Sequence, residues 1–222
     1  MPLISIKKTC RNSLIGLWQI DGNICIEDVC PKCVSGKISQ MCQKRQDETA
    51  AVYATLKEIC KRLNPSASTN KKSDVYVPTI EHDSNGKPLL DNGWNISISH
   101  TIGFACVIIS QSKTVALDIE YVNNRVFKIA NRFLSIREKQ DLEGCAKNET
   151  FEQQRTRLLL YWCAKETIYK YFSEENLSFD DIFVNIGKKI ERCGEIEATN
   201  KKSGRTIRIA YTQNNEYVLT YT

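Results

Sequence analysis

Two carboxylates stand one residue apart in the segment Thr114–Tyr121, which reads TVALDIEY. Its apolar residues alternate with Ala116, Asp118 and Glu120, and alternate side chains of a β-strand point to opposite faces. One face of the predicted strand is therefore apolar, and the other carries both carboxylates. Neighbouring like charges on a half-buried strand need compensation, and Mg²⁺ takes carboxylate and phosphate oxygens as ligands. A strand with an ordinary solvated face shows the same alternation, so both interpretations stay open.

A third carboxylate and an ammonium lie on the predicted helix Leu158–Phe172, which reads LLLYWCAKETIYKYF and contains no Gly or Pro. Glu166 and Lys170 are four residues apart, so they share one edge of this helix. Such pairs are common on solvated helices, and the spacing alone does not indicate chemistry. Combined with the strand, however, the helix offers the groups needed for metal-assisted chemistry on a phosphate.

Two segments that precede the strand carry groups suited to phosphate recognition. The residues 83–88 read DSNGKP, and the Asn-Gly pair predicts a tight turn next to Lys87. The segment Asn95–Thr101 reads NISISHT, in which Ser99 and His100 supply a hydroxyl and an N–H donor. An ordinary turn and a satisfied polar histidine at a strand end are the alternatives.

These four segments together resemble the motifs of the 4'-phosphopantetheinyl transferase superfamily, in its long, surfactin-synthetase-type (holo-carrier-protein synthase) form. ALDIE and WCAKETIYK match the paired signature of that family, and NGKPLL and NISISHT resemble two further motifs. The resemblance spans residues 44–172. It implies an α+β fold of two similar α/β halves related by a pseudo-two-fold, in a monomer. Residues 1–112 are expected to recognise the nucleotide of coenzyme A, and residues 113–222 to hold the carboxylate site and the carrier-docking surface.

The resemblance also implies an activity. Such an enzyme moves the 4'-phosphopantetheine arm of coenzyme A onto a serine hydroxyl of an apo acyl or peptidyl carrier protein, and it releases adenosine 3',5'-bisphosphate. Mg²⁺, or Mn²⁺ in its place, is the implied metal. The carrier could serve fatty-acid, polyketide or nonribosomal peptide synthesis, because the sequence does not distinguish these pathways.

Individual residues receive expected roles from the same resemblance. Glu166 is the expected base toward the carrier serine, acting directly or through a metal-bound water. Lys170 is the expected group that neutralises or protonates the leaving phosphate. The expected metal ligands are Asp118, Glu120 and Glu166. The expected contacts with coenzyme A are Lys44, Arg45, Gly86, Lys87, Pro88, Ser99, His100, Asp118, Lys165 and Lys170.

One departure from the family concerns the 3'-phosphate of coenzyme A. Tyr53 stands where the family commonly has an arginine. Recognition of this phosphate is therefore expected to be weaker, or to pass through Lys44, Arg45 or Lys57.

Other elements must position these groups. An amphipathic helix is predicted over Asp47–Leu63, and Ser135 has capping-box spacing to Glu138 at the start of another helix. The predicted strands are Ser13–Ile20, Ile24–Glu27, Val75–Val77, Ile96–His100, Phe104–Ile109 and, in an antiparallel sheet of the second half, Ile182–Ile186, Thr206–Tyr211 and Glu216–Tyr221.

The composition limits the class of protein. At 222 residues, with 41% hydrophobic and 26% charged residues, the chain is typical of a soluble protein with one large domain or two small ones. It contains neither an apolar run that could span a bilayer nor a secretory signal, so we expect it in the cytoplasm. The net charge of +5 is spread out, which suits an acidic partner or a polyphosphate better than a nucleic acid.

The ten cysteines are spread along the chain, as expected for reduced thiols. Cys25, Cys30, Cys33 and Cys42 contain a single CxxC pair, whereas structural zinc sites usually show two paired ligand sets. Free thiols are the favoured interpretation, with a zinc site as the alternative.

Two other function classes compete with the transferase. A Mg²⁺-dependent phosphohydrolase could use the same carboxylates, but it gives no reason for the GKP turn or the Ser-His pair. A non-enzymatic protein that binds coenzyme A or a carrier would keep the motifs without transfer. Replacing Glu166 by Gln separates these classes, because a binder has no transfer to lose.

Overall fold

A four-stranded antiparallel sheet and one long helix dominate the N-terminal part of the computed structural model, which describes residues 2–10, 12–63 and 75–222. The chain divides into two compact units, Met1–Val115 and Ala116–Thr222. In the first unit, the sheet order is β1-β2-β6-β5. The strands are β1 (Leu3–Cys10), β2 (Ser13–Gln19), β5 (Asn95–Thr101) and β6 (Phe104–Ser110). The predicted strands Ser13–Ile20, Ile96–His100 and Phe104–Ile109 are confirmed within one residue at each end.

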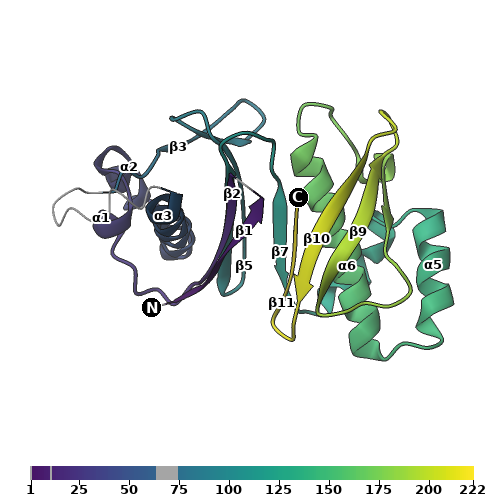
Figure 1. Ribbon diagram of the computed structural model, residues 1–222. Coiled ribbons are helices and arrows are strands. Elements are labelled where there is room, and N and C mark those ends of the chain that lie inside the picture. The colour runs from purple at the N-terminus through teal and green to yellow at the C-terminus, as the bar shows by residue number, and fades with distance from the viewer. Residues whose placement is uncertain (1, 11, 64–74) are drawn as a thin grey trace. The chain divides into compact units, whose positions relative to one another are not determined.

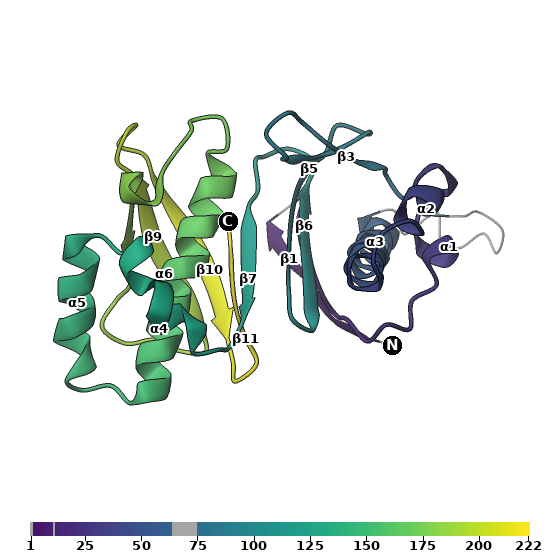
Figure 2. The same ribbon diagram turned by 180° about the vertical axis from the view of Figure 1, so that it is seen from behind.

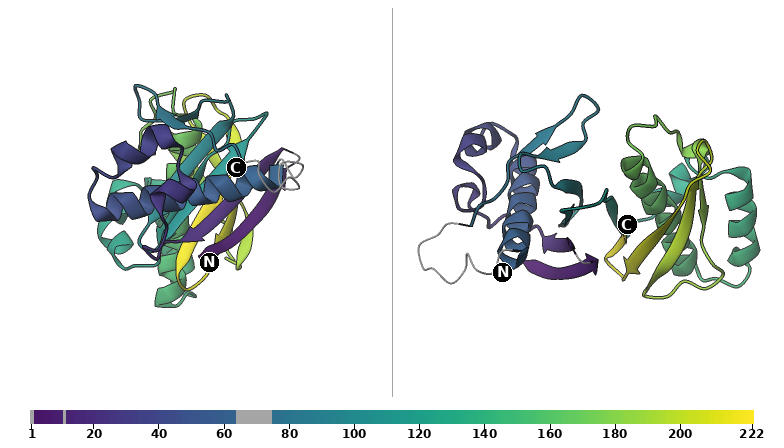
Figure 3. Two further views of the ribbon diagram at one scale, coloured as in Figure 1. Left: turned by 90° about the vertical axis from the view of Figure 1, so that its left-hand side faces the viewer. Right: turned by 45° about the horizontal axis from the view of Figure 1, so that its top comes forward.

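Helix α3 (Gln43–Leu63) crosses one face of this sheet (Figures 1 and 3). It begins four residues before the predicted start. Small buried residues, including Ala51 and Ala54, allow a close approach to β2. At the crossing, a Cβ added to Gly16 would lie only 2.5 Å from Cγ2 of Thr55, so the packing requires a glycine there.

Two predicted strands of this unit are wrong. Ile24–Glu27 overlaps the start of the short helix α1 (Ile26–Val29), because four alternating residues do not separate a strand from one helical turn. Val75–Val77 forms no strand, and the Tyr76 hydroxyl instead donates a hydrogen bond to Asp91. The remaining elements are α2 (Lys32–Ile38) and the hairpin of β3 (Ile80–His82) and β4 (Pro88–Leu90).

The second unit contains a five-stranded antiparallel sheet in the order β7-β11-β10-β9-β8. Three of its strands, β8, β10 and β11, lie where strands were predicted, whereas β9 was not anticipated. The strands are β7 (Leu117–Tyr121), β8 (Ile182–Asn185), β9 (Cys193–Asn200), β10 (Thr206–Gln213) and β11 (Tyr217–Tyr221). Both units combine helices with antiparallel sheets, which confirms the predicted α+β class.

Helix α6 (Phe151–Tyr171) packs against this sheet, with α4 and α5 on its outer side (Figure 2). It begins seven residues before the predicted start, at a capping box formed by Thr150 and Gln153. The predicted capping box of Ser135 and Glu138 is confirmed at the start of α5. The helical segments are α4 (Arg125–Ile129), η2 (Ala130–Arg132), α5 (Ile136–Ala146) and η3 (Phe179–Asp181). None of the helices in the described ranges is long and apolar enough to cross a bilayer.

Candidate active site

Asp118 and Glu120 lie on β7, an edge strand of the sheet in the C-terminal unit. Asp118 pairs in register with Thr220 of β11, and Glu120 pairs with Val218. The Asp118 residue is buried, at 5% exposure, whereas Glu120 is half-buried. A buried carboxylate is costly unless a donor or a cation compensates it. Helix α6 supplies that compensation.

Two side chains of α6 hold these carboxylates. Lys170 Nζ lies 2.8 Å from Asp118 Oδ1 and donates a second hydrogen bond to the backbone oxygen of Leu117 at 3.1 Å. Trp162 Nε1 donates to Glu120 Oε1 at 3.3 Å. The strand and the helix, about fifty residues apart in sequence, are therefore joined by polar contacts at two points.

Glu166 lies between these two points on α6. Burial, followed by the negative charge of Asp118 and that of Glu120, raises the pKa of Glu166 to about 7, and only Lys170 opposes this shift. For Lys170 itself, burial lowers the pKa, but the charges of Asp118 and Glu166 outweigh it and raise the pKa overall. The site therefore combines a carboxylate that titrates near neutral pH with a lysine that stays charged.

The three carboxylates offer the hard oxygen donors that Mg²⁺ prefers. In the positions that they occupy, Asp118 is engaged by Lys170 and Glu120 by Trp162. Across residues 2–10, 12–63 and 75–222, no group of three or more His, Cys, Asp or Glu side chains is arranged to hold a metal ion. The donor set thus fits the metal chemically, and the shared ion stays a prediction.

Lys165, which was predicted to contact the pyrophosphate, is held by groups of the protein itself. Its side chain is fully buried, and Nζ contacts Glu138 Oε2 at 2.8 Å and the backbone oxygens of Phe179 and Ile182 at 3.0 and 2.9 Å. These three acceptors use every donor of the ammonium group. In the structure Lys165 therefore has a structural role, and its predicted contact with coenzyme A stays an untested prediction.

A second polar cluster forms in the N-terminal unit around Glu48, which is 7% exposed. Arg45 Nη1 lies 3.2 Å from Glu48 Oε2, and Lys44 Nζ lies 3.8 Å from Oε1. His100 joins from β5, with Nδ1 at 3.5 Å from Glu48 Oε1 and Nε2 at 3.1 Å from Arg45 Nη1. Three predicted phosphate contacts thus gather around one carboxylate. Sequence analysis missed Glu48, although its spacing of three and four residues from Arg45 and Lys44 was a usable signal.

The other predicted coenzyme A contacts also lie in the N-terminal unit. Gly86 has a φ of 80° in the turn between β3 and β4, a left-handed conformation that favours glycine. Oδ1 of Asp83 accepts hydrogen bonds from the backbone N–H groups of Asn85 and Lys87, which fixes the turn. Pro88 begins β4, and Ser99 lies buried on β5. The predicted tight turn is confirmed.

A hollow of about 210 Å³ lies beside Glu120 in the C-terminal unit. Both apolar and polar side chains line it, Glu120 and Arg125 among the polar ones. The lining residues are Glu120, Tyr121, Asn123, Arg125, Val126, Ile129, Leu159 and Trp162. A small apolar group could therefore lie next to the carboxylates.

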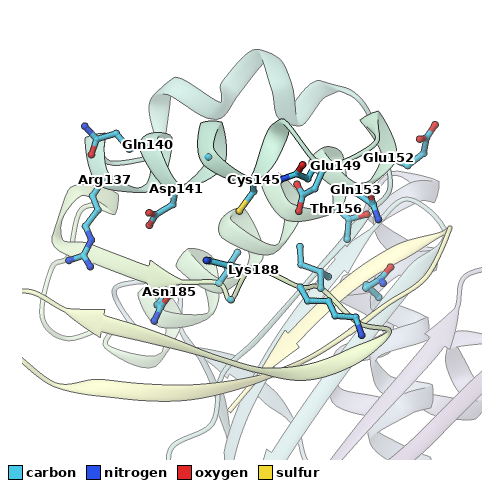
Figure 4. A pocket seen from close by; sticks show the side chains of 17 residues that line it. Arg137, Gln140, Asp141, Cys145, Glu149, Glu152, Gln153, Thr156, Asn185 and Lys188 are labelled. Carbon is cyan, nitrogen blue, oxygen red and sulfur yellow. The ribbon is translucent and has the colours of Figure 1, made fainter.

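A larger groove of about 1000 Å³ runs between α5 and the loop after β8 (Figure 4). Both signs of charge line it, including Asp141 and Glu152 on the helical side and Lys188 on the loop side. The buried Arg157 links the two sides of the groove. It pairs with Glu149 on the helical side and donates hydrogen bonds to the backbone oxygens of Gly187 and Lys188 on the loop side. The groove reaches α6 no further than Thr156, ten residues or about 15 Å along the helix from Glu166.

The cysteines are free thiols in the structure. All ten lie in the described residues. No metal-holding group forms among the described Cys, His, Asp and Glu side chains, so Cys25, Cys30, Cys33 and Cys42 do not make one. Burial, with a smaller effect of Glu27, raises the pKa of Cys30 to about 12, as expected for an inert packed thiol.

Comparison with known proteins shows a similarity of the C-terminal unit to a known family. Residues 114–222 match the family model described as the 4'-phosphopantetheinyl transferase superfamily, and this match covers the whole C-terminal unit. A search of curated proteins gave no match. The family match supports a transferase enzyme.

Proposed function

We propose that this protein transfers 4'-phosphopantetheine from coenzyme A to a serine hydroxyl of an apo acyl or peptidyl carrier protein and releases adenosine 3',5'-bisphosphate. The observation that carries the proposal is the meeting of Asp118, Glu120, Glu166 and Lys170 on β7 and α6, within the unit that matches the family. Ten free thiols suit a reducing compartment, and we infer a cytoplasmic location.

The carboxylate with the raised pKa is the base in this proposal. In the reaction, the serine oxygen attacks the β-phosphorus of coenzyme A, and the bond from that phosphorus to the leaving nucleotide oxygen breaks. The serine proton passes to Glu166, whose pKa of about 7 suits a base that works near neutral pH. A base with an ordinary Glu pKa would take up the proton less readily.

Lys170 neutralises the leaving phosphate. Asp118 holds its ammonium group at 2.8 Å and keeps it charged, so the lysine presents a fixed positive charge to a developing negative one. Asp118 therefore positions Lys170 in addition to serving as a proposed metal ligand. The hollow beside Glu120 suits the branched hydrocarbon part of the transferred arm.

Asp118, Glu120 and Glu166 are the residues that would hold Mg²⁺ or Mn²⁺. When bound, such an ion supplies charge neutralisation on the pyrophosphate and orients it. Removal of divalent ions with a chelator is expected to abolish transfer, and added Mg²⁺ to restore it.

The nucleotide end of coenzyme A is assigned to the N-terminal unit. Lys44, Arg45 and His100 are the proposed phosphate contacts, and Glu48 holds the three together before the ligand arrives. The Tyr53 hydroxyl accepts the backbone N–H of Ile80 at 3.1 Å, so it supports the strand before the Gly86 turn. Tyr53 therefore does not replace the phosphate contact of an arginine.

Mass spectrometry of an apo carrier protein tests the proposal. We expect incubation with this protein, coenzyme A and Mg²⁺ to add the mass of one phosphopantetheine arm to the carrier. Glu166→Gln should reduce the rate by about 10²–10⁴-fold, the usual contribution of a general base. Glu152→Gln, at an exposed position on the same helix, is the matched control and should keep the rate.

Two outcomes would favour the other function classes. Release of phosphate from coenzyme A without modification of any carrier would indicate a phosphohydrolase. Tight binding of coenzyme A with no transfer, unchanged in Glu166→Gln, would indicate a binding protein.

A further inference from the structure

The large groove between α5 and the loop after β8 has no part in the proposed transfer (Figure 4). Its volume of about 1000 Å³ lies at the upper end for ligand sites and leaves room for a short chain segment. Among the described residues that line it, none is aromatic and two are isoleucines. The groove therefore suits neither a stacked nucleobase nor a predominantly apolar molecule.

One face of α5 forms the helical wall of this groove. The lining residues Arg137, Gln140, Asp141, Gly144 and Cys145 recur at intervals of three and four, as on one side of a helix. Gly144 lies inside the helix, where glycine is less favourable than alanine. A Cβ added to it would meet no heavy atom elsewhere in the described chain within 4 Å. Packing therefore does not require this glycine, and its lack of a side chain leaves the groove open.

Five side-chain amides line the groove. They are Gln140, Asn148, Gln153, Asn185 and Gln213. Each offers a donor and an acceptor, the same pair of groups that a peptide unit carries. Within the described residues, the side chains of Gln140, Asn148 and Asn185 make no hydrogen bond, so these amides are available to a ligand.

The loop wall presents backbone donors on a fixed frame. In the described part of the chain, the backbone N–H groups of residues 186–190 make no hydrogen bond. Arg157 fixes this segment, because its guanidinium donates to the backbone oxygens of Gly187 and Lys188 at 2.9 and 2.7 Å. A wall that is already in place lowers the cost of ordering it when a ligand binds.

Opposite charges stand on the two walls. Asp141 and Glu152 on the helical wall and Lys188 on the loop wall make no ion pair with any described residue. Figure 4 shows Asp141 and Lys188 on opposite walls. The other charged lining residues have partners, namely Glu149 with Arg157, Lys189 with Glu191, and Arg137 with the ring of Phe183. Because alternate side chains of an extended chain point to opposite sides, a segment that alternates basic and acidic residues would complement both walls.

We propose that this groove binds an extended peptide segment in which basic and acidic residues alternate. The side-chain amides and the free N–H groups of the loop hold the peptide backbone, and the charged walls select the side chains. The stretch of α5 from Arg137 to Cys145 spans about 12 Å, which accommodates about four extended residues. Peptide binding of this kind is independent of the proposed transfer, because the groove ends about 15 Å along α6 from Glu166.

Two capped, fluorescein-labelled hexapeptides test the proposal. The probe alternates lysine and glutamate, and its control has the lysines followed by the glutamates, so the two peptides share one composition and one net charge. We expect fluorescence anisotropy to show saturable binding of the alternating peptide and about tenfold weaker binding of the control. Added salt should weaken the binding of the alternating peptide.

Variants of α5 locate the binding site. Gly144→Leu fills the groove and should abolish binding, with no loss of thermal stability because leucine favours a helix more than glycine does. Asp141→Asn should weaken binding about three- to fivefold. The matched control is Glu143→Gln, exposed on the same helix but outside the groove, which should leave binding unchanged. Bound peptide should also slow the alkylation of Cys145 in the groove and leave that of Cys42 in the N-terminal unit unchanged.

Three results would overturn the proposal. The first is no binding of the alternating peptide up to about 1 mM. The second is equal binding of both peptides, which would mean that net composition and not an extended two-sided segment is recognised. The third is binding that persists in Gly144→Leu without protection of Cys145, which would place the peptide elsewhere. Transfer to an apo carrier is measured separately on the same variants and should proceed at the unmodified rate.

Discussion

The charge of Glu166 depends on pH near neutrality. Its pKa rises from an ordinary value of 4.5 to about 7, so the folded chain holds the proton more tightly than the unfolded chain between these two values. Folding stability from this group is therefore lost as pH rises through that range, and the full cost is present above pH 7. Stability is the clearest readout, because it needs no assumption about substrate.

Glu166→Gln removes that cost. We expect the free energy of unfolding of the variant minus that of the unmodified protein to be about 1–3 kcal/mol larger at pH 8 than at pH 5, which means that the variant gains stability as the pH rises. Urea denaturation at both pH values, without divalent ions, measures it. The exposed Glu152→Gln is the control, and an equal effect of Glu166→Gln at both pH values would contradict the shift.

Lys165 is a motif residue whose partners in the structure are groups of the protein itself. Sequence placed it among the coenzyme A contacts, because it stands next to Glu166 in the signature. Burial and three acceptors give it instead the task of holding α5 and η3 to α6, since Glu138 also accepts the backbone N–H of Val184 on β8. Lys165 and Glu166 are about 100° apart around the helix axis, so their adjacency in the signature does not place them in the same surroundings.

Truncation of this lysine is expected to destabilise the protein strongly. Lys165→Met leaves the carboxylate of Glu138 buried without its cation, which we expect to cost about 3–5 kcal/mol of unfolding free energy. Glu138→Gln/Lys165→Met should recover a large part of that loss, because the amide oxygen still accepts and no charge is left unpaired. Urea denaturation of the single and double variants measures both, and a double variant no more stable than the single one would contradict the explanation.

At the scale of elements, close packing between α3 and β2 depends on one glycine. Gly16→Ala would place its methyl group 2.5 Å from Cγ2 of Thr55 on the helix, and we expect a loss of about 1–3 kcal/mol. The loss should be smaller in Gly16→Ala/Thr55→Ser, because serine lacks the clashing methyl group. Thermal or urea unfolding of the single and double variants tests this. Equal destabilisation of both would place the strain elsewhere.

Elements with a long periodic pattern could be predicted, and short ones could not. The α3 and α6 helices, the capping box of Ser135 and most strands follow from residue pattern. The α1 helix was taken for a strand because its pattern covers only a few residues. Strand β9 was missed because its residues, reading CGEIEATN, are largely polar, and pairing with β8 and β10 stabilises it instead.

At the scale of the whole molecule, the sequence predicted the motif residues of the site but not the side chains that contact them. Asp118, Glu166 and Lys170 meet as the motif spacing suggests, and Lys44, Arg45 and His100 gather in one cluster. Glu48 at the centre of that cluster and Trp162 on Glu120 were not assigned, because such contacts depend on tertiary packing. The family match covers the C-terminal unit, so the assignment of the N-terminal unit depends on its own polar cluster.

The thiols offer a test of the two hydrophobic cores. Cys60 and Cys163 lie within the cores of the N-terminal and C-terminal units, and burial raises the pKa of both, so they should resist alkylation in the folded protein. The exposed Cys42 and Cys193 should react within minutes under the same conditions. Iodoacetamide labelling at pH 8 followed by peptide mass spectrometry measures each rate, with urea-unfolded protein as the control in which all ten react. Rapid native labelling of Cys163 alone would mean that the C-terminal core opens easily, and with it the packing that joins α6 to β7.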